Sequence, residues 1–213
     1  FEGLLRADPK NARALLGLAE LKARTGGTKE EINAAISAAV KANPELPGPR
    51  VLLVNQLLAQ RDAKTALASA QEASAALPDS VEVMDALGRA QLAAAQPQQA
   101  VKSFTRMAAM RPEQPGPELS LAEAHVAAKD LAAAKRSLNK ALTMRPGLVP
   151  AQVALAQIAL REDRPADALR IAQDIQRAQP KQAAGHLLEA DVEISRKRPA
   201  AAVDPLRKAL QLG

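Results

Sequence analysis

Three side chains near the carboxyl end of the chain have the types and spacing of a metal site. His186, Glu189 and Glu193 stand at i, i+3 and i+7, so on a helix they share one face, and imidazole and carboxylate groups are zinc ligands. No fourth ligand or supporting hydrogen-bond pattern accompanies them. We therefore predict a polar seam without a metal, in which His186 or a nearby arginine meets Glu189, because a buried unpaired carboxylate is costly.

No residue pattern typical of catalysis is present. The chain has no cysteine, no glycine-rich loop that could hold a phosphate, and no histidine placed by pattern beside a serine and an acid. We therefore expect a non-catalytic protein without a cofactor.

Positive charge is concentrated in the second part of the chain. The net charge is +6, yet residues 1–128 hold 14 basic and 14 acidic residues, whereas residues 129–213 hold 15 and 9. The densest cluster is Arg196-Lys197-Arg198. Basic patches attract phosphates, but proteins that bind single-stranded nucleic acid also use aromatic platforms, and aromatic residues make up 1% of the chain. We expect solvated cations at helix ends and no nucleic-acid partner.

The composition favours helices. There are 49 alanines, and β-branched and aromatic residues, which favour strands, are scarce. No apolar run approaches the roughly 18 residues that span a bilayer, so we expect no membrane span in this segment.

Prolines divide the chain into equal units. Pro9, Pro44, Pro78, Pro112, Pro146 and Pro180 are separated by 35, 34, 34, 34 and 34 residues, a period typical of solenoids. Other positions keep the same register. Twelve residues before successive prolines stand Ile32, Ala66, Ala100, Ala134 and Ala168. Nine after them stand Leu18, Leu53, Leu87, Leu121, Leu155 and, as the exception, Glu189.

These columns follow the Leu-Gly, Ala-x3-Phe and Pro pattern of two-helix repeats, and segment 81–112, VEVMDALGRAQLAAAQPQQAVKSFTRMAAMRP, is the clearest copy. The chain resembles the tetratricopeptide repeat (TPR) family over essentially its whole length. The resemblance implies an all-α TPR-type α-solenoid, a right-handed superhelix of antiparallel helix pairs with about thirteen helices. The expected organisation is one array: the end of a preceding second helix at 1–9, then repeats at about 12–45, 47–79, 81–113, 115–147, 149–181 and 183–213.

The first helix of each pair lacks the Trp and Tyr that the family usually carries there. Glu118 and His186 are among the residues in the Trp column, and Gln91 and Glu193 are among those in the Tyr column. We therefore expect more polar packing between helices than in typical members of the family.

The remaining prolines predict helix boundaries. Pro97, Pro165 and Pro199 are placed to begin second helices, and Pro49 and Pro117 to begin first helices, because the first turn of a helix tolerates a missing N–H.

Three further features depart from the regular pattern. Gly26-Gly27 marks the turn that carries the extra residue of the 35-residue spacing. Pro205 falls inside the last expected helix, which it should kink or fray. The columns are interrupted at both ends of the chain, which predicts that this segment belongs to a longer protein.

First helices of such arrays line the concave face, where these proteins usually bind. Two aliphatic stripes and a polar row between them are expected there. The candidate partner-binding residues are Leu16, Val51, Asn55, Leu58, Asp85, Arg89, Leu92, Leu119, Glu123, Val126, Val153, Gln157, Leu160, Leu187 and Asp191. An apolar groove of this kind indicates a protein or peptide partner. The alternative is that these residues pack against adjacent helices, and both uses can coexist.

Several short sequence segments carry a narrower resemblance. ALLGLAEL, GPRVLLVNQLLAQ, LGRAQLAAAQPQQAVKSF and GHLLEADVEI are similar to segments of the TPR lipoproteins of bacterial PEP-CTERM/exosortase systems. That family implies a periplasmic or outer-membrane-anchored location and a partner in polysaccharide export or protein sorting. Two alternatives stay open: a regulatory or substrate-selecting arm of a larger enzyme such as a glycosyltransferase, and a cytoplasmic TPR adaptor.

Overall fold

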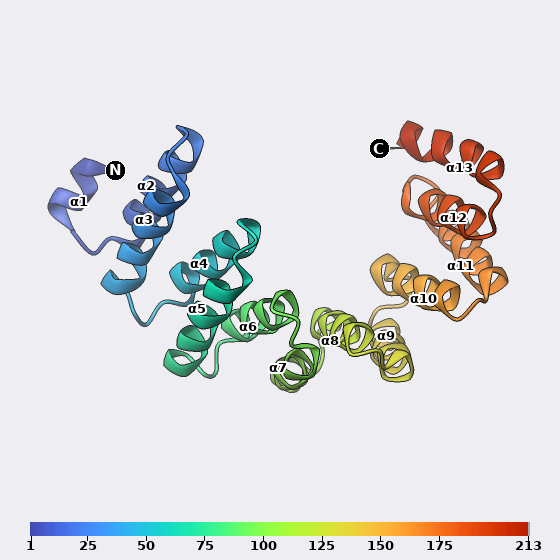
Figure 1. Cartoon of the computed structure of the whole chain (residues 1–213), viewed down its shortest axis with the longest axis horizontal. Coiled ribbons are helices and arrows are strands. Elements are labelled where there is room, and N and C mark those ends of the chain that lie inside the picture. Colours follow the sequence, from blue (N-terminus) through green and yellow to red (C-terminus); the bar gives the residue numbers. More distant parts are fainter. Residues whose placement is uncertain (213) are drawn as a thin grey trace. The chain divides into compact units, whose positions relative to one another are not determined.

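The computed structural model describes residues 1–212, except for the side chain of Glu2, and within them it contains thirteen α-helices and no strand (Figure 1). The helices are α1 Glu2–Ala7, α2 Ala12–Arg24, α3 Lys29–Ala42, α4 Pro47–Ala59, α5 Ala63–Ala76, α6 Val81–Ala93, α7 Pro97–Met110, α8 Pro115–Ala127, α9 Leu131–Met144, α10 Val149–Arg161, α11 Pro165–Ala178, α12 Ala184–Ser195 and α13 Pro199–Leu212. The expected all-α fold is confirmed. The last expected repeat, 183–213, ends at Gly213, which lies outside the described residues.

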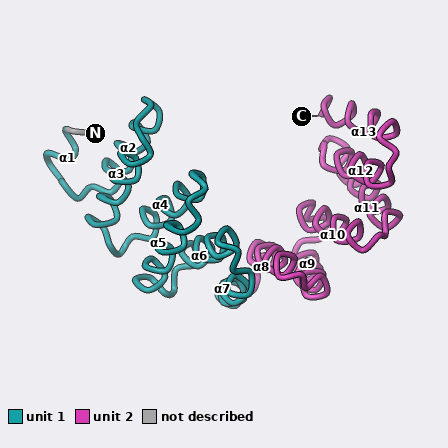
Figure 2. Tube along the Cα trace, in the orientation of Figure 1, with its two compact units in different colours: residues 1–110 teal, residues 111–213 magenta. Residues whose placement is uncertain are grey.

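The chain divides into two compact units, Phe1–Met110 with α1 to α7 and Arg111–Gly213 with α8 to α13 (Figure 2). Within each unit, consecutive helices pack against each other, as α6 does on α7 and α8 on α9. A turn of only a few residues joins the members of each pair, so they run antiparallel. A single array through both units stays a prediction.

The small residues that stand twelve positions before successive prolines form what we call the alanine column. This column lies where the two helices of a pair approach each other. Ala66, Ala100, Ala134 and Ala168 are each 0% exposed, and Ala134 and Ala168 share buried clusters with residues of α8 and α10, the first helices of their pairs. Gly88 makes a similar contact, because a Cβ atom there would overlap the ring of Phe104, a side chain that is itself 0% exposed. A helix pair of this chain therefore depends on short side chains at fixed positions, and it buries its remaining apolar face only by stacking on a neighbour.

The turn inside each pair ends its first helix with one residue in the left-handed region. Gly26 takes this position in the first turn with φ of 80°. Arg61, Ala95, Lys129, Asp163 and Lys197 take it in the others with φ between 56° and 63°. The N–H of the next residue then bonds back across the turn, as Gln96 does to the carbonyl of Gln91 at 2.8 Å, the pattern of a Schellman motif.

The first turn has four residues, 25–28, whereas the later ones have three. The expectation that the Gly26-Gly27 turn holds the extra residue is therefore confirmed.

Prolines start five of the thirteen helices in the described residues, although not all in the expected places. Pro97, Pro165 and Pro199 begin α7, α11 and α13, as predicted. Pro49 and Pro117 do not begin α4 and α8. They are the third residues of helices that begin at the prolines of positions 47 and 115, and the first turn tolerates both because its N–H groups have no helical partner.

Pro205 does not fray the last helix, so the expectation of fraying is wrong, while a kink at this proline stays a prediction. The helix α13 continues through Pro205 to Leu212. Pro205 is itself buried, so packing offsets the loss of one backbone hydrogen bond.

The alanine column can be tested by overpacking it. Replacing Ala100 by Phe should lower the free energy of unfolding by roughly 1–3 kcal/mol, because the ring forces the helices of the pair apart. The measurement is chemical denaturation followed by circular dichroism. Ala109→Phe is the matched control, since Ala109 is exposed on the same helix and the same change in helix propensity applies. Equal losses for the two variants would contradict the packing role of the column.

The turn geometry can be tested at two adjacent alanines. Ala95 has φ of 56°, a region that costs an L-residue about 1–2 kcal/mol and glycine almost nothing. Ala95→Gly should therefore raise the free energy of unfolding by about 0.5–1 kcal/mol, after the added flexibility of the unfolded chain is subtracted. Ala94, with φ of −84°, is the control, and Ala94→Gly should lower stability instead. Thermal melts that rank the two variants in the opposite order would refute this account of the turn.

Candidate functional site

The first helix of each pair carries the predicted partner-binding residues. They lie on α2, α4, α6, α8, α10 and α12, and most of their side chains are half-buried. Leu187 is more accessible, with 47% exposure, and Glu123, Gln157 and Asp191 are exposed as well. The first-helix surface of each unit is therefore partly apolar and open to solvent.

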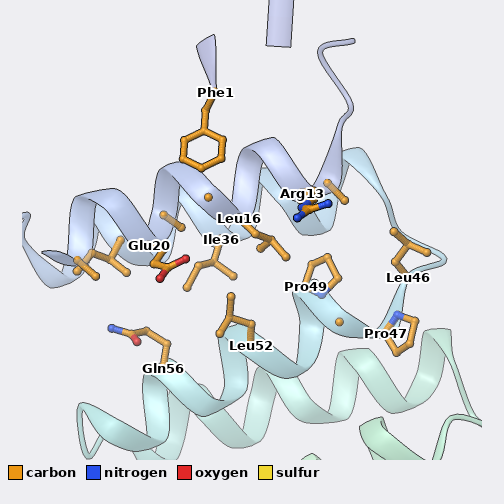
Figure 3. Close-up of a pocket in the computed structure, with 16 residues that line it drawn as sticks. Phe1, Arg13, Leu16, Glu20, Ile36, Leu46, Pro47, Pro49, Leu52 and Gln56 are labelled. Carbon is orange, nitrogen blue, oxygen red and sulfur yellow. The ribbon is translucent and has the colours of Figure 1, made fainter. Parts of the chain in front are cut away.

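In the first unit a cavity of about 840 Å³ lies between α2 and α4, and we call it the α2–α4 pocket (Figure 3). Leu16 of α2, Ile36 of α3 and Leu52 of α4 are among the apolar residues that line it. Arg13 and Gln56 add polar groups to the lining. Neither of these two side chains bonds to another described residue. The pocket is thus an apolar hollow with free hydrogen-bonding groups.

In the second unit a smaller cavity of about 340 Å³ lies between α8 and α10, and we call it the α8–α10 pocket. Its deepest residues are Leu138 of α9 and Ile158 of α10, each 1% exposed. Leu119 and Val126 of α8 and Ala154 of α10 form half-buried walls. The predicted site residues Leu119 and Val126 are thereby brought together around one cavity.

Three polar side chains also line the α8–α10 pocket. Glu123 belongs to α8, and Gln157 and Arg161 belong to α10, one helical turn apart. All three are exposed, and none bonds through its side chain to another described residue. A carboxylate, an amide and a guanidinium group are therefore available to a ligand.

Other members of the predicted stripes pack against neighbouring helices instead. Val153 and Leu160 of α10 contact a buried cluster that includes Leu188 of α12. The helix α4, which carries Leu58, also packs directly against α6, which carries Leu92. The packing alternative therefore holds for Val153 and Leu160, while Leu119 and Val126 combine packing with pocket lining.

Sequence reasoning missed the far wall of each pocket. Leu52 and Gln56 line the α2–α4 pocket from α4, and Pro150, Ala154 and Arg161 line the α8–α10 pocket from α10. Each first helix presents two edges, one to the preceding first helix and one to the following one, and the predicted stripes and polar row left out the positions of these five residues. One signal could have found Arg161: it lies four residues after Gln157, so both share a helix face.

The polar row between the stripes has varied partners. Asp85 Oδ2 accepts a hydrogen bond from Arg89 Nε at 2.9 Å, so these two predicted site residues satisfy each other. Asn55 differs, because its side-chain oxygen is buried and has no hydrogen-bond partner among the described residues.

Polar contacts replace aromatic packing between several helices, as the sequence predicts. Ser103 Oγ donates to Gln91 Oε1 at 2.7 Å in a buried contact between α6 and α7. Lys140 Nζ lies 2.6 Å from Glu118 Oε1, and the Glu118 side chain is only 4% exposed. Removing one partner of such a pair leaves a buried polar group unsatisfied, so we assign these contacts to folding.

Glu189 is half-buried and is met by an unexpected partner. Gln176 Nε2 of α11 donates to Glu189 Oε2 at 2.7 Å, and His186 Nδ1 lies 3.9 Å from the same oxygen. The expected polar seam is present, but an amide rather than His186 or an arginine supplies the hydrogen bond, and His186 Nδ1 is buried with no hydrogen-bond partner among the described residues. No group of three or more His, Cys, Asp or Glu residues among those described could hold a metal ion.

The basic cluster at 196–198 is largely engaged within the chain. Arg196 Nη1 and Arg198 Nη2 lie 3.4 and 2.8 Å from the carboxylate oxygens of Glu193. Lys197 occupies the left-handed turn position, with φ of 58°. Two of the three cations thus pair with one acid at the end of α12, whereas solvated cations were expected there.

None of the helices in the described part of the chain is long and apolar enough to cross a membrane.

Solved structures with the same fold come from several proteins. A tetratricopeptide repeat protein from Parabacteroides merdae ATCC 43184 has 14% identity and a TM-score of 0.74, over 95% of this chain and 80% of that chain. PilW, a widely conserved type IV pilus biogenesis factor, has 21% identity and a TM-score of 0.70, over 91% of this chain and 90% of that chain. YrrB, a TPR protein with an unusual peptide-binding site, has 17% identity and a TM-score of 0.54, over 84% and 92%. At these identities the likeness shows the fold alone.

Family models agree with the fold. One tetratricopeptide repeat model matches residues 1–47 and 86–149, and a second matches residues 125–192. No curated protein sequence is similar enough to count as a match. The first of these models alone covers just over half of the chain, and the paired helices recur with the same period, so the chain belongs to the tetratricopeptide repeat family.

Proposed function

We propose that the chain is a non-catalytic scaffold that binds a peptide segment of a partner protein on its first-helix surfaces. The observation that carries this proposal is the pair of pockets between first helices, α2–α4 and α8–α10. Each combines aliphatic walls with polar side chains that have no partner in the described chain. Concave apolar sites with a few convergent polar groups are the usual form of ligand sites.

A peptide fits this surface better than a substrate undergoing a reaction. Both pockets lack a cysteine, and the polar groups beside the α8–α10 pocket are a single acid, an amide and a guanidinium, with no nucleophile held beside a base. Aliphatic walls bind apolar side chains, and side-chain amides such as that of Gln157 match the donor and acceptor of a peptide group. The peptide-binding site of YrrB, a protein of the same fold, supports the same class of partner.

A bacterial envelope role is the finer form of this proposal. It rests on sequence segments such as ALLGLAEL and GHLLEADVEI, which resemble segments of the TPR lipoproteins of PEP-CTERM systems. That resemblance would place the partner in polysaccharide export or protein sorting. An arm of a glycosyltransferase and a cytoplasmic adaptor are the alternatives. The full-length reading frame tests them: a lipoprotein signal upstream supports the envelope role, and a catalytic domain beside the repeats contradicts it.

Filling both pockets tests the peptide-binding proposal. A displayed library of random peptides is selected on the wild-type chain and on the double variant Gly48→Phe/Ala154→Phe. Gly48 lines the α2–α4 pocket, where an added Cβ atom would meet nothing within 4 Å, and Ala154 lines the other pocket. Selected peptides should bind the wild type at least about tenfold more tightly, because burying one large apolar side chain contributes about 1.5–3 kcal/mol.

Matched variants control for added bulk. Gly116 stands in the same Pro-Gly-Pro start of α8 as Gly48 does in α4 and also faces open space, and Ala132 is exposed on α9. The variant Gly116→Phe/Ala132→Phe should bind the selected peptides as the wild type does. If the library yields no binder, or if the pocket-filled variant binds every selected peptide with wild-type affinity, the proposal is wrong.

A further inference from the structure

The α8–α10 pocket is large enough to hold at least one large side chain. Its volume of about 340 Å³ is at the lower end of the roughly 300–1,000 Å³ found for ligand pockets. The floor consists of Leu138 and Ile158, each 1% exposed, and the walls are aliphatic. No polar atom of the chain therefore needs to be satisfied at the bottom of the pocket, and an aliphatic side chain is the group that fits there.

Two opposite charges flank this aliphatic pocket without pairing with each other. Glu123 belongs to α8 and Arg161 to α10, so the charges come from opposite walls. Neither has an ion-pair partner among the described residues. Oppositely charged side chains that do not pair across a pocket leave each charge available to a complementary group of the ligand.

Glu162, the residue that follows Arg161, is already bonded to other cations. Glu162 Oε1 accepts a hydrogen bond from Lys135 Nζ at 2.7 Å, and Arg164 also bonds to this carboxylate. The hydrogen bond from Lys135 has the largest effect and that from Arg164 adds to it, so the pKa of Glu162 lies below its usual value. The carboxylate therefore stays ionised and remains paired with Lys135 and Arg164. Glu162 is therefore not the ion-pair partner of Arg161.

Gln157 completes the lining of the pocket. It lies one helical turn before Arg161 on α10 and lines the pocket. Its amide can donate to one peptide carbonyl and accept from one peptide N–H. A peptide backbone that crosses the pocket over Gln157 would then have the carboxylate of Glu123 on one side and the guanidinium group of Arg161 on the other.

On the basis of the proposed peptide-binding function, we infer that the α8–α10 pocket selects a peptide segment of mixed charge. The segment has an aliphatic residue that enters the pocket, a basic residue on one side of it and an acidic residue on the other. The basic residue meets Glu123, and the acidic residue meets Arg161. The pocket offers a nucleic acid no aromatic platform, and Arg161 is the single cation in its lining.

Charge reversal on both sides of the contact tests this inference. Four synthetic nine-residue peptides share a central leucine and differ at the two positions that flank it, with lysine and glutamate in either order, two lysines, or two glutamates. Their dissociation constants are measured on the full chain by fluorescence anisotropy. The wild type should bind one of the mixed peptides best, by about threefold or more over the two-lysine and two-glutamate peptides, as expected when an exposed pair is exchanged for repulsion.

The variants should reorder the peptides in opposite directions. Arg161→Glu should make the two-lysine peptide the preferred ligand, and Glu123→Lys should make the two-glutamate peptide preferred. Both side chains are exposed and unpaired, so the thermal melts of the variants should match that of the wild type. Raising the salt concentration should reduce these preferences, because exposed charges are screened.

Control variants carry the same charge changes away from the pocket. Arg136→Glu and Glu113→Lys alter exposed residues of the same unit and should leave the order of the peptides unchanged. Replacing the central leucine of the peptide by aspartate should abolish binding.

The outcomes separate this inference from the function on which it rests. It is overturned if Arg161→Glu and the wild type rank the four peptides alike, or if none of the four binds while the random library yields other ligands. In both cases peptide binding itself stands. A library that yields no ligand at all overturns the proposed function together with the inference.

Discussion

The close approach of two helices at a column of small residues is the contact on which the rest of the structure depends. Ala66, Ala100, Ala134 and Ala168 are fully buried there, and a larger side chain would separate the two backbones. Because such short side chains bury little apolar area, one pair is not stable by itself. Its remaining apolar face must be covered by the next pair, and repetition of the unit follows from this requirement.

The same packing explains why the first-helix surface forms pockets rather than an even groove. Each first helix can use its apolar edge either to contact the next first helix or to line a space. Val153 and Leu160 of α10 contact the cluster that includes Leu188 of α12. Between α8 and α10, small residues such as Ala154 leave part of the edge of Leu119 uncovered. Pockets therefore arise where the packing between neighbouring first helices is incomplete.

The repeat could be predicted because its determinants recur at a fixed period. Proline and alanine columns fixed the helix pairs, since only a helix-pair array places small residues so regularly. The site could be predicted only in part. Leu119 and Val126 follow from the expected inner face, but Ala154 and Arg161 line the same pocket from an edge that the column pattern does not distinguish. The partner of Glu189 could not be predicted, because Gln176 meets it from a different helix.

Burial of the alanine column can be measured directly, because the chain contains no cysteine and a single introduced thiol reports on its own site. Ala66→Cys and Ala134→Cys would be compared with Ala68→Cys and Ala132→Cys, at exposed positions of the same helices α5 and α9. Thiol labelling should be slower at the column sites by about 100-fold or more, because it requires local opening. Equal labelling rates at column and exposed positions would contradict the central claim that these small residues form the contact between helices.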